Sequence, residues 1–231
     1  KPLGIDLGIW FEPEMVSPNS DLYRAHPDWC IHIPNRPRSQ GRHQFMLNLS
    51  KPEVCDYIYE SVAAILKSGM IKYVKWDYNR NMTEIANEKL PADQQREVTH
   101  RYYLGLYSLL ERLVTTFPDI LFESCSGGGG RFDAGMLYYM PQVWTSDNSD
   151  AIERLKIQYG TSLVYPLSSM SAHVSASPNH QTGHVTPFDT RFTVALTGSF
   201  GYELDPTSLS DEDKASVLRT AGIYKEYGER I

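Results

Sequence analysis

Short apolar runs alternate with amphipathic stretches along the whole chain, and this alternation restricts the folds that the sequence can adopt. The runs have the length and composition of buried strands, whereas the stretches between them have helical spacing. Such an order is typical of a parallel sheet whose strands are joined by crossover helices. The runs predicted as strands are residues 7–11, 45–49, 71–76, 120–123, 143–146, 163–167 and 194–204.

The predicted helices have recognisable ends and apolar faces. Ser50 and Glu53 have the spacing of a capping box, and Gly69 stands where a left-handed residue would end that helix. Further helices are predicted over residues 93–116 and from about 149 to 159. The 93–116 segment places apolar side chains on one stripe: Tyr102, Leu106, Leu109, Leu110 and Leu113.

A last helix is predicted after Ser210, because an acidic residue, Asp213, follows at the capping-box position.

Acidic residues stand at or just past the carboxyl ends of the predicted strands. They are Glu12, Asp77, Glu123, Asp147 and Asp205. In a closed barrel of parallel strands these ends meet at one mouth, where active sites are built. The sequence therefore favours an α/β fold of the (β/α)8 TIM barrel type over an open sheet with two exposed edges. Because the predicted strands are one short of eight, we expect strands 2 to 8 to be present and the first strand to be missing.

The length of 231 residues suits one barrel domain, so residues 1–231 are predicted to be a single catalytic barrel region. The chain opens at Lys1 without a methionine, which suggests a piece cut from a longer polypeptide.

Composition excludes several partners and locations. With 22 Lys and Arg against 28 Asp and Glu, the net charge of −6 argues against nucleic acid as a partner. No apolar run approaches the ~20 residues of a membrane span, so no membrane partner is expected. The cysteines, Cys30, Cys55 and Cys125, have neither metal-ligand nor disulfide spacing, which favours a reducing, cytoplasmic location.

The segment 71–80 places charged residues at a predicted strand end. Side chains alternate along a strand, so Lys75, Asp77 and Asn79 share one face, and Trp76 and Tyr78 share the other. An interior lysine beside an interior aspartate is costly unless both charges have partners. The pair is either a structural ion pair or a functional carboxylate held ionised by the lysine.

The segment 142–154 carries a second candidate carboxylate. Asp147 closes a predicted strand, Asp150 can cap the next helix, and Arg154 lies one helical turn further on, near enough to orient a carboxylate. Alone, such a loop is a helix cap. Paired with Asp77 across a barrel mouth, Asp147 completes the two carboxylates that glycoside hydrolysis requires.

Three further features leave alternatives open. The unbroken glycines at 127–130 allow close approach to a ligand or simply form a flexible turn, and no Lys-Ser/Thr follows as a phosphate loop requires. His180 and His184 have metal-ligand spacing, but the surrounding proline and glycine favour an ordinary loop. Trp10 can stack on a sugar or fill the core.

Together these segments resemble the signature blocks of the bacterial-type α-galactosidases of glycoside hydrolase family 36. The blocks stand in the family's order over nearly the whole chain: Gly8-Ile-Trp-Phe-Glu-Pro-Glu-Met15, Lys75-Trp-Asp-Tyr-Asn79, Ser124-Cys-Ser-Gly-Gly-Gly-Gly-Arg131, Ser146-Asp-Asn-Ser-Asp150 and Pro178-Asn-His-Gln-Thr-Gly183.

The resemblance implies a retaining α-galactosidase that acts on melibiose, raffinose or stachyose-type oligosaccharides. It makes Asp77 the nucleophile and Asp147 the general acid and base, with Asp150 as the fallback acid. No cofactor and no metal are implied. The residues predicted to bind substrate are Trp10, Arg42, Lys75, Asn79, Cys125, Gly127, Gly128 and Arg154.

The resemblance also implies parts that this chain does not contain. Family members carry a β-sandwich domain before the barrel and a small β domain after it, and the full-length enzyme is expected to be a homo-oligomer, often a tetramer. With the first strand missing, an exposed sheet edge and an incomplete pocket are expected to leave the isolated 231-residue chain poorly active. Hydrolysis by this chain at the rate of a full-length enzyme would contradict that expectation.

A retaining mechanism also predicts the distance between the two carboxyl groups and their protonation states. The two carboxyl groups should lie ~5–5.5 Å apart, against ~6.5–9.5 Å in an inverting enzyme. Asp77 should stay ionised beside Lys75, and the pKa of Asp147 should be raised. Two rival functions remain: a sugar-binding barrel without catalysis, and a metal-dependent hydrolase that uses His180 and His184.

Overall fold

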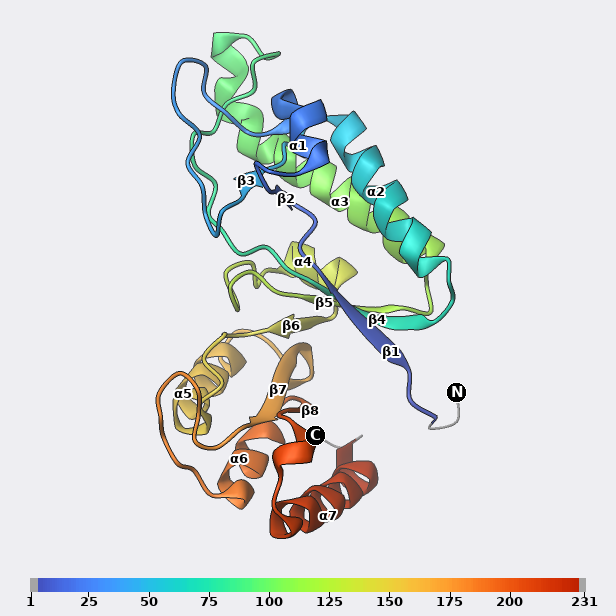
Figure 1. Ribbon diagram of the computed structural model, residues 1–231, viewed down its shortest axis with the longest axis vertical. Helices are drawn as coiled ribbons and strands as arrows, with labels where there is room; N and C mark the ends of the chain where they lie inside the picture. Colours follow the sequence, from blue (N-terminus) through green and yellow to red (C-terminus); the bar gives the residue numbers. More distant parts are fainter. Residues whose placement is uncertain (1–3, 229–231) are drawn as a thin grey trace. The chain divides into compact units, whose positions relative to one another are not determined.

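The structure is a computed structural model that describes residues 4–228. These residues form two compact units. The first unit comprises residues 4–127 and 134–140, and the second comprises residues 128–133 and 141–228. Strands and helices alternate in both units, as the sequence predicts (Figure 1).

Parallel strands form the main sheet of the first unit, and the predictions for 7–11 and 71–76 are confirmed at both ends of each strand. In the register, Lys75 lies beside Trp10 on one side and beside Glu123 on the other. Because parallel strands end at the same edge of a sheet, Glu12 and Asp77 follow two neighbouring strands there. The strands, in hydrogen-bonded order, are β1 (Leu7–Phe11), β4 (Ile71–Trp76) and β5 (Leu121–Ser124).

The predicted strand over 45–49 does not join this parallel sheet. Only Phe45–Met46 is extended as a strand, β3, and it pairs antiparallel with β2 (Met15–Val16). The apolar side chains of this segment instead pack into the core, and the Asn48 side chain closes a turn by accepting the backbone amide of Ser50. Expecting a barrel strand there was wrong, because a continuous buried run has no strand-specific periodicity.

The helices of the first unit follow the predicted positions with adjusted ends. The stretch 93–97 belongs to a 3-10 turn, so the long helix begins at Val98 and ends, as predicted, at Thr116. The helices are α1 (Asp21–Ala25), α2 (Pro52–Leu66), α3 (Val98–Thr116) and α4 (Ala134–Tyr139), with 3-10 turns η1 (Pro27–Trp29) and η2 (Ala92–Glu97).

The capping box predicted at the start of α2 is wrong. Lys51 is the N-cap residue and makes no side-chain cap, while the Ser50 hydroxyl donates to Asn48 Oδ1 at 2.6 Å. Pro52 provides the helix start, because its fixed φ suits the first helical position, where no amide hydrogen is needed. The prediction for Gly69 is confirmed, since it has a φ of +71° just after the helix.

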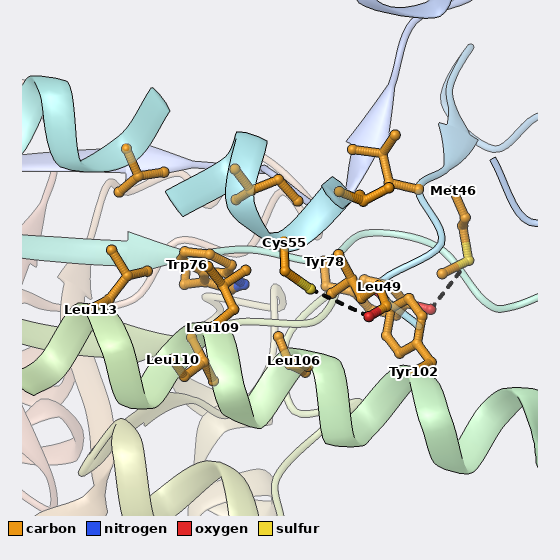
Figure 2. Packing of buried hydrophobic residues seen from close by; sticks show 14 of the residues in the cluster. Met46, Leu49, Cys55, Trp76, Tyr78, Tyr102, Leu106, Leu109, Leu110 and Leu113 are labelled. Atoms are coloured by element: carbon orange, nitrogen blue, oxygen red, sulfur yellow. Dashed lines mark hydrogen bonds between the residues drawn. The ribbon is translucent and has the colours of Figure 1, made fainter. Parts of the chain in front are cut away.

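The core of the first unit lies between α2, α3 and the sheet. All five residues of the predicted α3 stripe are fully buried, and Figure 2 shows α3 leucines directed toward Trp76 and Cys55. Trp76 and Tyr78 point into this core, as the strand alternation predicts. Each buried leucine contributes roughly 1.5–3 kcal/mol to stability, so this contact fixes the end of β4.

Gly105 allows α3 to approach the 45–49 segment closely. A Cβ atom at this position would lie 1.8 Å from the carbonyl oxygen of Leu49. We therefore expect Gly105→Ala to destabilise the chain by about 1–3 kcal/mol in urea unfolding, as overpacking against backbone does. Gly160→Ala is the matched control, because its helix position is open and alanine should stabilise it by roughly 0.5–1 kcal/mol. A neutral Gly105→Ala would contradict the packing described.

The second unit also contains parallel strands joined by helices (Figure 1). Asp150 caps α5, as predicted, and Ser210 caps α7 by accepting the Asp213 amide. The elements are β6 (Gln142–Trp144), α5 (Ala151–Ser162), η3 (Leu167–Ser169), β7 (Met170–Ser175), α6 (Phe188–Ala195), β8 (Ser199–Glu203), η4 (Pro206–Ser208) and α7 (Asp211–Tyr227).

One predicted strand of this unit is wrong, and another is confirmed only over its second half. The 163–167 run begins just after α5 ends at Ser162 and forms the turn that leads into η3, with Leu163 and Val164 exposed by 69% and 75%. The 194–204 run combines the end of α6 with β8. The strand that pairs between β6 and β8 is instead β7, which was not predicted because its serine, alanine and histidine residues interrupt the apolar pattern.

Parallel strands that alternate with helices are consistent with an incomplete α/β barrel. Within residues 4–228, none of the helices combines the length and the apolar character needed to cross a membrane.

Candidate active site

Asp77 directly follows β4 and is held by donors from several segments of the first unit. Its backbone amide donates to the carbonyl oxygen of Phe11 at 2.8 Å. The indole Nε1 of Trp10 donates to Asp77 Oδ2 at 3.0 Å, and the amide of Tyr78 donates to Oδ1 at 2.8 Å. Both carboxylate oxygens are thus fixed, while the side chain is 6% exposed.

These contacts control the charge of Asp77. Burial by itself raises the pKa of the carboxyl group, but hydrogen bonds to its charged form outweigh that effect, and the pKa lies below its ordinary value. The donors are the side chains of Asn79, Trp10 and Cys125 and the backbone amide of Tyr78. The expectation of an ionised Asp77 therefore agrees with this environment, although its causes differ from the lysine that the sequence suggested.

Glu12 connects other predicted residues to the Asp77 cluster, which we define as Asp77, Trp10, Asn79 and Cys125. Glu12 Oε1 accepts from Asn79 Nδ2 at 2.7 Å and from Arg42 Nη1 at 3.0 Å. Glu12 follows β1 in the same way that Asp77 follows β4. Glu12 stands at a predicted strand end in the sequence, but it was not predicted as a site residue.

Arg42 occupies a strained turn. Gly41 and Gln44 exchange backbone hydrogen bonds of 3.1 and 2.9 Å, and the two central residues, Arg42 and His43, have φ values of +51° and +62°. Non-glycine residues pay roughly 1–2 kcal/mol each in this left-handed region. Such strain clusters at functional sites, which supports a role for the Arg42 side chain beyond the turn itself.

Lys75 forms an ion pair with Glu123. Its Nζ lies 3.2 Å from Glu123 Oε1, and the fully buried Glu123 also accepts the hydroxyl of Tyr73. Glu123, on β5, therefore neutralises the charge of Lys75, on β4. The sequence suggested either a structural ion pair of Lys75 with Asp77 or a lysine that keeps Asp77 ionised. The structure contains an ion pair of Lys75, but with Glu123.

The glycine run begins in the first unit and continues in the second. In the first unit, the amide of Gly127 donates to Asn79 Oδ1 at 3.1 Å, and Gly127 has a φ of +54°. In the second unit, Gly128 has a φ of +87°, and a Cβ atom there would lie 2.7 Å from Ser146 Cα. Glycine is therefore required at 128 both by conformation and by the close approach to the loop before Asp147.

Asp147 is exposed to solvent in the loop between β6 and α5 of the second unit. The indole Nε1 of Trp144 donates to Asp147 Oδ1 at 3.1 Å. Trp144 was not among the predicted site residues, although its position three residues before Asp147 is visible in the sequence.

Arg154 is 3% exposed and is held by groups of the second unit. Its guanidinium donates to Thr145 Oγ1 and to the carbonyl oxygen of Ser171, both at 2.7 Å, and to Gln158 Oε1 at 3.0 Å. The guanidinium carbon also lies 4.4 Å from the centre of the Trp144 ring. These contacts place Arg154 behind the Asp147 loop, and the prediction that it binds substrate stays a prediction.

Asp150, the fallback acid, is engaged as the N-cap of α5. It accepts the amides of Ile152 and Glu153, the hydroxyl of Thr182, and His184 Nδ1 at 2.8 Å. Burial raises its pKa, but these hydrogen bonds and the nearby histidine outweigh burial, so the pKa is lowered. A carboxyl group that stays ionised is a poor general acid, which favours Asp147 for that role.

His180 and His184 are not arranged as metal ligands in the structure. His184 contacts Asp150, whereas His180 is exposed to solvent. Over residues 4–228, no group of three or more His, Cys, Asp or Glu side chains could hold a metal ion.

Comparison with known proteins gives consistent matches. The family model Melibiase matches residues 1–231. The chain is 62% identical over 224 residues to alpha-galactosidase AgaA of Geobacillus stearothermophilus, covering 97% of this chain and 31% of AgaA. It is 57% identical over 226 residues to alpha-galactosidase Mel36A of Lactobacillus acidophilus, covering 98% of this chain and 31% of that protein. The chain thus spans less than a third of either relative.

Solved structures give the same result. The crystal structure of the glycoside hydrolase family 36 alpha-galactosidase AgaA from Geobacillus stearothermophilus matches with a TM-score of 0.96 at 61% identity, over 98% of this chain and 32% of that one. Variants of AgaA have been solved in complex with raffinose and with stachyose, and each matches with the same TM-score of 0.96.

Proposed function

Because the chain belongs to the melibiase family, among the glycoside hydrolase family 36 α-galactosidases, we propose that it carries the catalytic core of a retaining α-galactosidase. The proposed substrates are oligosaccharides that end in α-linked galactose, such as melibiose, raffinose and stachyose. The observation that carries the proposal is Asp77, an ionised carboxylate at a strand's carboxyl end whose oxygens are fixed by Trp10 and Tyr78.

In the first proposed step, a carboxylate oxygen of Asp77 attacks the anomeric carbon of galactose. The bond from this carbon to the glycosidic oxygen breaks as the bond to Asp77 forms, and the Asp147 carboxyl group gives its proton to the departing oxygen. The products are the covalent galactosyl-enzyme, the free leaving sugar and the Asp147 carboxylate.

In the second proposed step, water attacks the same carbon. Asp147 now acts as the base and takes one proton from the water, and the bond to Asp77 breaks to release galactose. Two inversions give net retention, and both carboxyl groups return to their initial protonation states. The exposure of Asp147 supports this role, because water must reach the base.

The proposed substrate-binding residues supply complementary donors and a ring. Lys75, Arg42 and Asn79 carry hydrogen-bond donors for sugar hydroxyls, and the half-exposed ring of Trp10 can cover an apolar sugar face. They are proposed with Cys125, Gly127, Gly128 and Arg154, and no metal or cofactor is proposed.

The test uses a chimeric enzyme in which this chain replaces the matching 224 residues of AgaA. We expect the chimeric enzyme to release galactose from melibiose and raffinose. Binding of galactose without turnover by a folded chimera would contradict the proposal and favour the rival sugar-binding barrel. Loss of activity on chelation would favour the metal-dependent alternative, whereas the proposal predicts no effect of a chelator.

The pH profile should report on the donors to Asp77. Trp10→Phe removes the donor to Oδ2, and the lost hydrogen bond should raise the pKa of Asp77. Because the nucleophile must be ionised, the acid limb of kcat/KM for an aryl α-galactoside should then move to higher pH. Trp29→Phe is the control, since Trp29 lies against His26 and Tyr57 instead. An unmoved acid limb in Trp10→Phe would contradict the role given to this bond.

Location and assembly are part of the proposal. The cysteines Cys30, Cys55 and Cys125 are all free thiols, which suits the reducing conditions of the cytoplasm. A homo-oligomer, of which a tetramer is the expected form, follows from the family. Light scattering on the chimeric enzyme would measure its mass, and a monomer would contradict the assembly without touching the catalytic proposal.

A further inference from the structure

We infer that Trp144 is a positioning residue for Asp147, and that Arg154 and His173 act on Asp147 by holding the Trp144 ring. The inference rests on the proposed function of Asp147 as acid and base. It adds Trp144 and His173, to which that function assigns no role, and it gives Arg154 a role through the Trp144 ring. All four residues belong to the second unit.

The first support is the direct contact. Trp144 Nε1 lies 3.1 Å from Asp147 Oδ1, at hydrogen-bond distance, while Trp144 itself is 4% exposed. An exposed aspartate in a loop samples several rotamers unless a fixed group holds it. The buried indole offers one N–H at a fixed position, so it selects the rotamer in which Oδ1 is occupied and Oδ2 remains available for proton transfer.

The second support is the pair of groups that fix the indole. The guanidinium carbon of Arg154 lies 4.4 Å from the centre of the Trp144 ring, and the His173 ring stacks on it at 4.8 Å with an interplanar angle of 24°. A cation over an indole face is the strongest of the cation–π arrangements. The ring is thereby fixed by contacts that do not involve Asp147.

The third support is that both groups belong to ordered elements. Arg154, on α5, is tied to the carbonyl oxygen of Ser171 on β7 at 2.7 Å, and His173 lies on β7 itself. Nδ1 of His173 is 3.9 Å from Glu203 Oε2 on β8. The position of the Trp144 N–H is therefore set by the sheet and α5, rather than by the loop that carries Asp147.

The consequence concerns the leaving group. Departure of a sugar alkoxide requires a proton from Asp147, whereas departure of a dinitrophenolate does not. A group that only positions the acid should matter for the first substrate and hardly for the second. A group that only stabilises the fold should lower both rates by the same factor.

The experiment compares melibiose with 2,4-dinitrophenyl α-galactoside in the chimeric enzyme. Trp144→Phe should lower kcat/KM about 10- to 100-fold for melibiose but less than about threefold for the dinitrophenyl substrate, because general acid catalysis and its alignment contribute factors of this order. Equal losses on both substrates, or no loss on either, would overturn the inference.

Two further variants keep the result unambiguous. If Trp144→Phe does not fold, β-(3-benzothienyl)alanine at position 144 keeps the shape of the ring but lacks the N–H, and the same selective loss is expected. Trp76→Phe is the matched control, because its N–H donates to Glu14 at 2.7 Å in the core of the first unit. Its losses should be equal for both substrates.

Asp147→Asn separates this inference from the proposed function. It should itself lose melibiose hydrolysis selectively. If it does not, the role of Asp147 fails. If Asp147→Asn behaves as expected and Trp144→Phe does not, only the positioning role of Trp144 fails.

Discussion

Asp77→Asn in the chimeric enzyme is expected to lower kcat/KM for aryl α-galactosides by roughly 10⁴- to 10⁶-fold, the order of loss caused by removing a covalent nucleophile. The amide has nearly the same shape as the carboxylate, but its nitrogen and neutral oxygen are poor nucleophiles toward the anomeric carbon. The oxygen can still accept the Tyr78 amide, so the fold should survive. The measurement is steady-state hydrolysis, with circular dichroism to verify folding.

Asp119→Asn is the control for that loss, because Asp119 is exposed in the turn before β5 and should leave activity unchanged. Asp77→Gly provides a second readout. Azide should enter the space left by the carboxylate and restore turnover, with a galactosyl azide of inverted configuration as product. A fully active Asp77→Asn would show that Asp77 is not the nucleophile.

Glu14→Ala is expected to destabilise the chain by about 3–5 kcal/mol, the largest stability effect that we predict. Glu14 is 0% exposed and accepts the indole N–H of Trp76 and the hydroxyl of Tyr102, so its removal takes away the acceptor of two buried donors and opens a cavity. The measurement is urea unfolding followed by tryptophan fluorescence.

Two variants define the cause of that effect. Glu14→Gln keeps the volume and one accepting oxygen, so we expect a smaller loss of about 1–3 kcal/mol. Glu60→Ala removes an exposed glutamate of α2 and should change stability by less than about 0.5 kcal/mol. If Glu14→Ala matched Glu60→Ala, the buried network would not contribute to stability as described.

The parts of the fold that the sequence predicts are those with a strong local pattern. β4 combines an apolar run with a following aspartate, and the α3 stripe repeats at helical spacing. β7 was not predicted, because it carries Ser171, His173 and Ser175. It is buried by the elements packed around it rather than by an apolar composition. The prediction of a strand over 163–167 was wrong for the opposite reason, because hydrophobicity alone does not distinguish a strand from the turn that follows a helix.

The candidate site shows the same division. Alternation along β4 was enough to separate Asp77 and Asn79 from the core side chains Trp76 and Tyr78. The bond between Asn79 and Glu12 joins residues 67 positions apart, so no spacing rule could indicate it.

The role of Trp144 also depends on the tertiary structure. From sequence alone, a tryptophan in an apolar run is predicted to be a core residue. Only the hydrogen bond from the Trp144 N–H to Asp147 indicates a second role. Likewise, the burial and hydrogen bonds of Asp150, which separate it from Asp147, depend on the 179–184 loop that follows β7.

Covalent trapping tests the central claim most directly. The chimeric enzyme would be incubated with a 2-fluoro or epoxide analogue of an α-galactoside, digested, and its labelled peptide mapped by mass spectrometry. The account predicts one galactose-derived label, on Asp77, formed in step with the loss of activity. An active chimera that is labelled at another residue, or not at all, would contradict the assignment of Asp77 as the nucleophile of a retaining α-galactosidase.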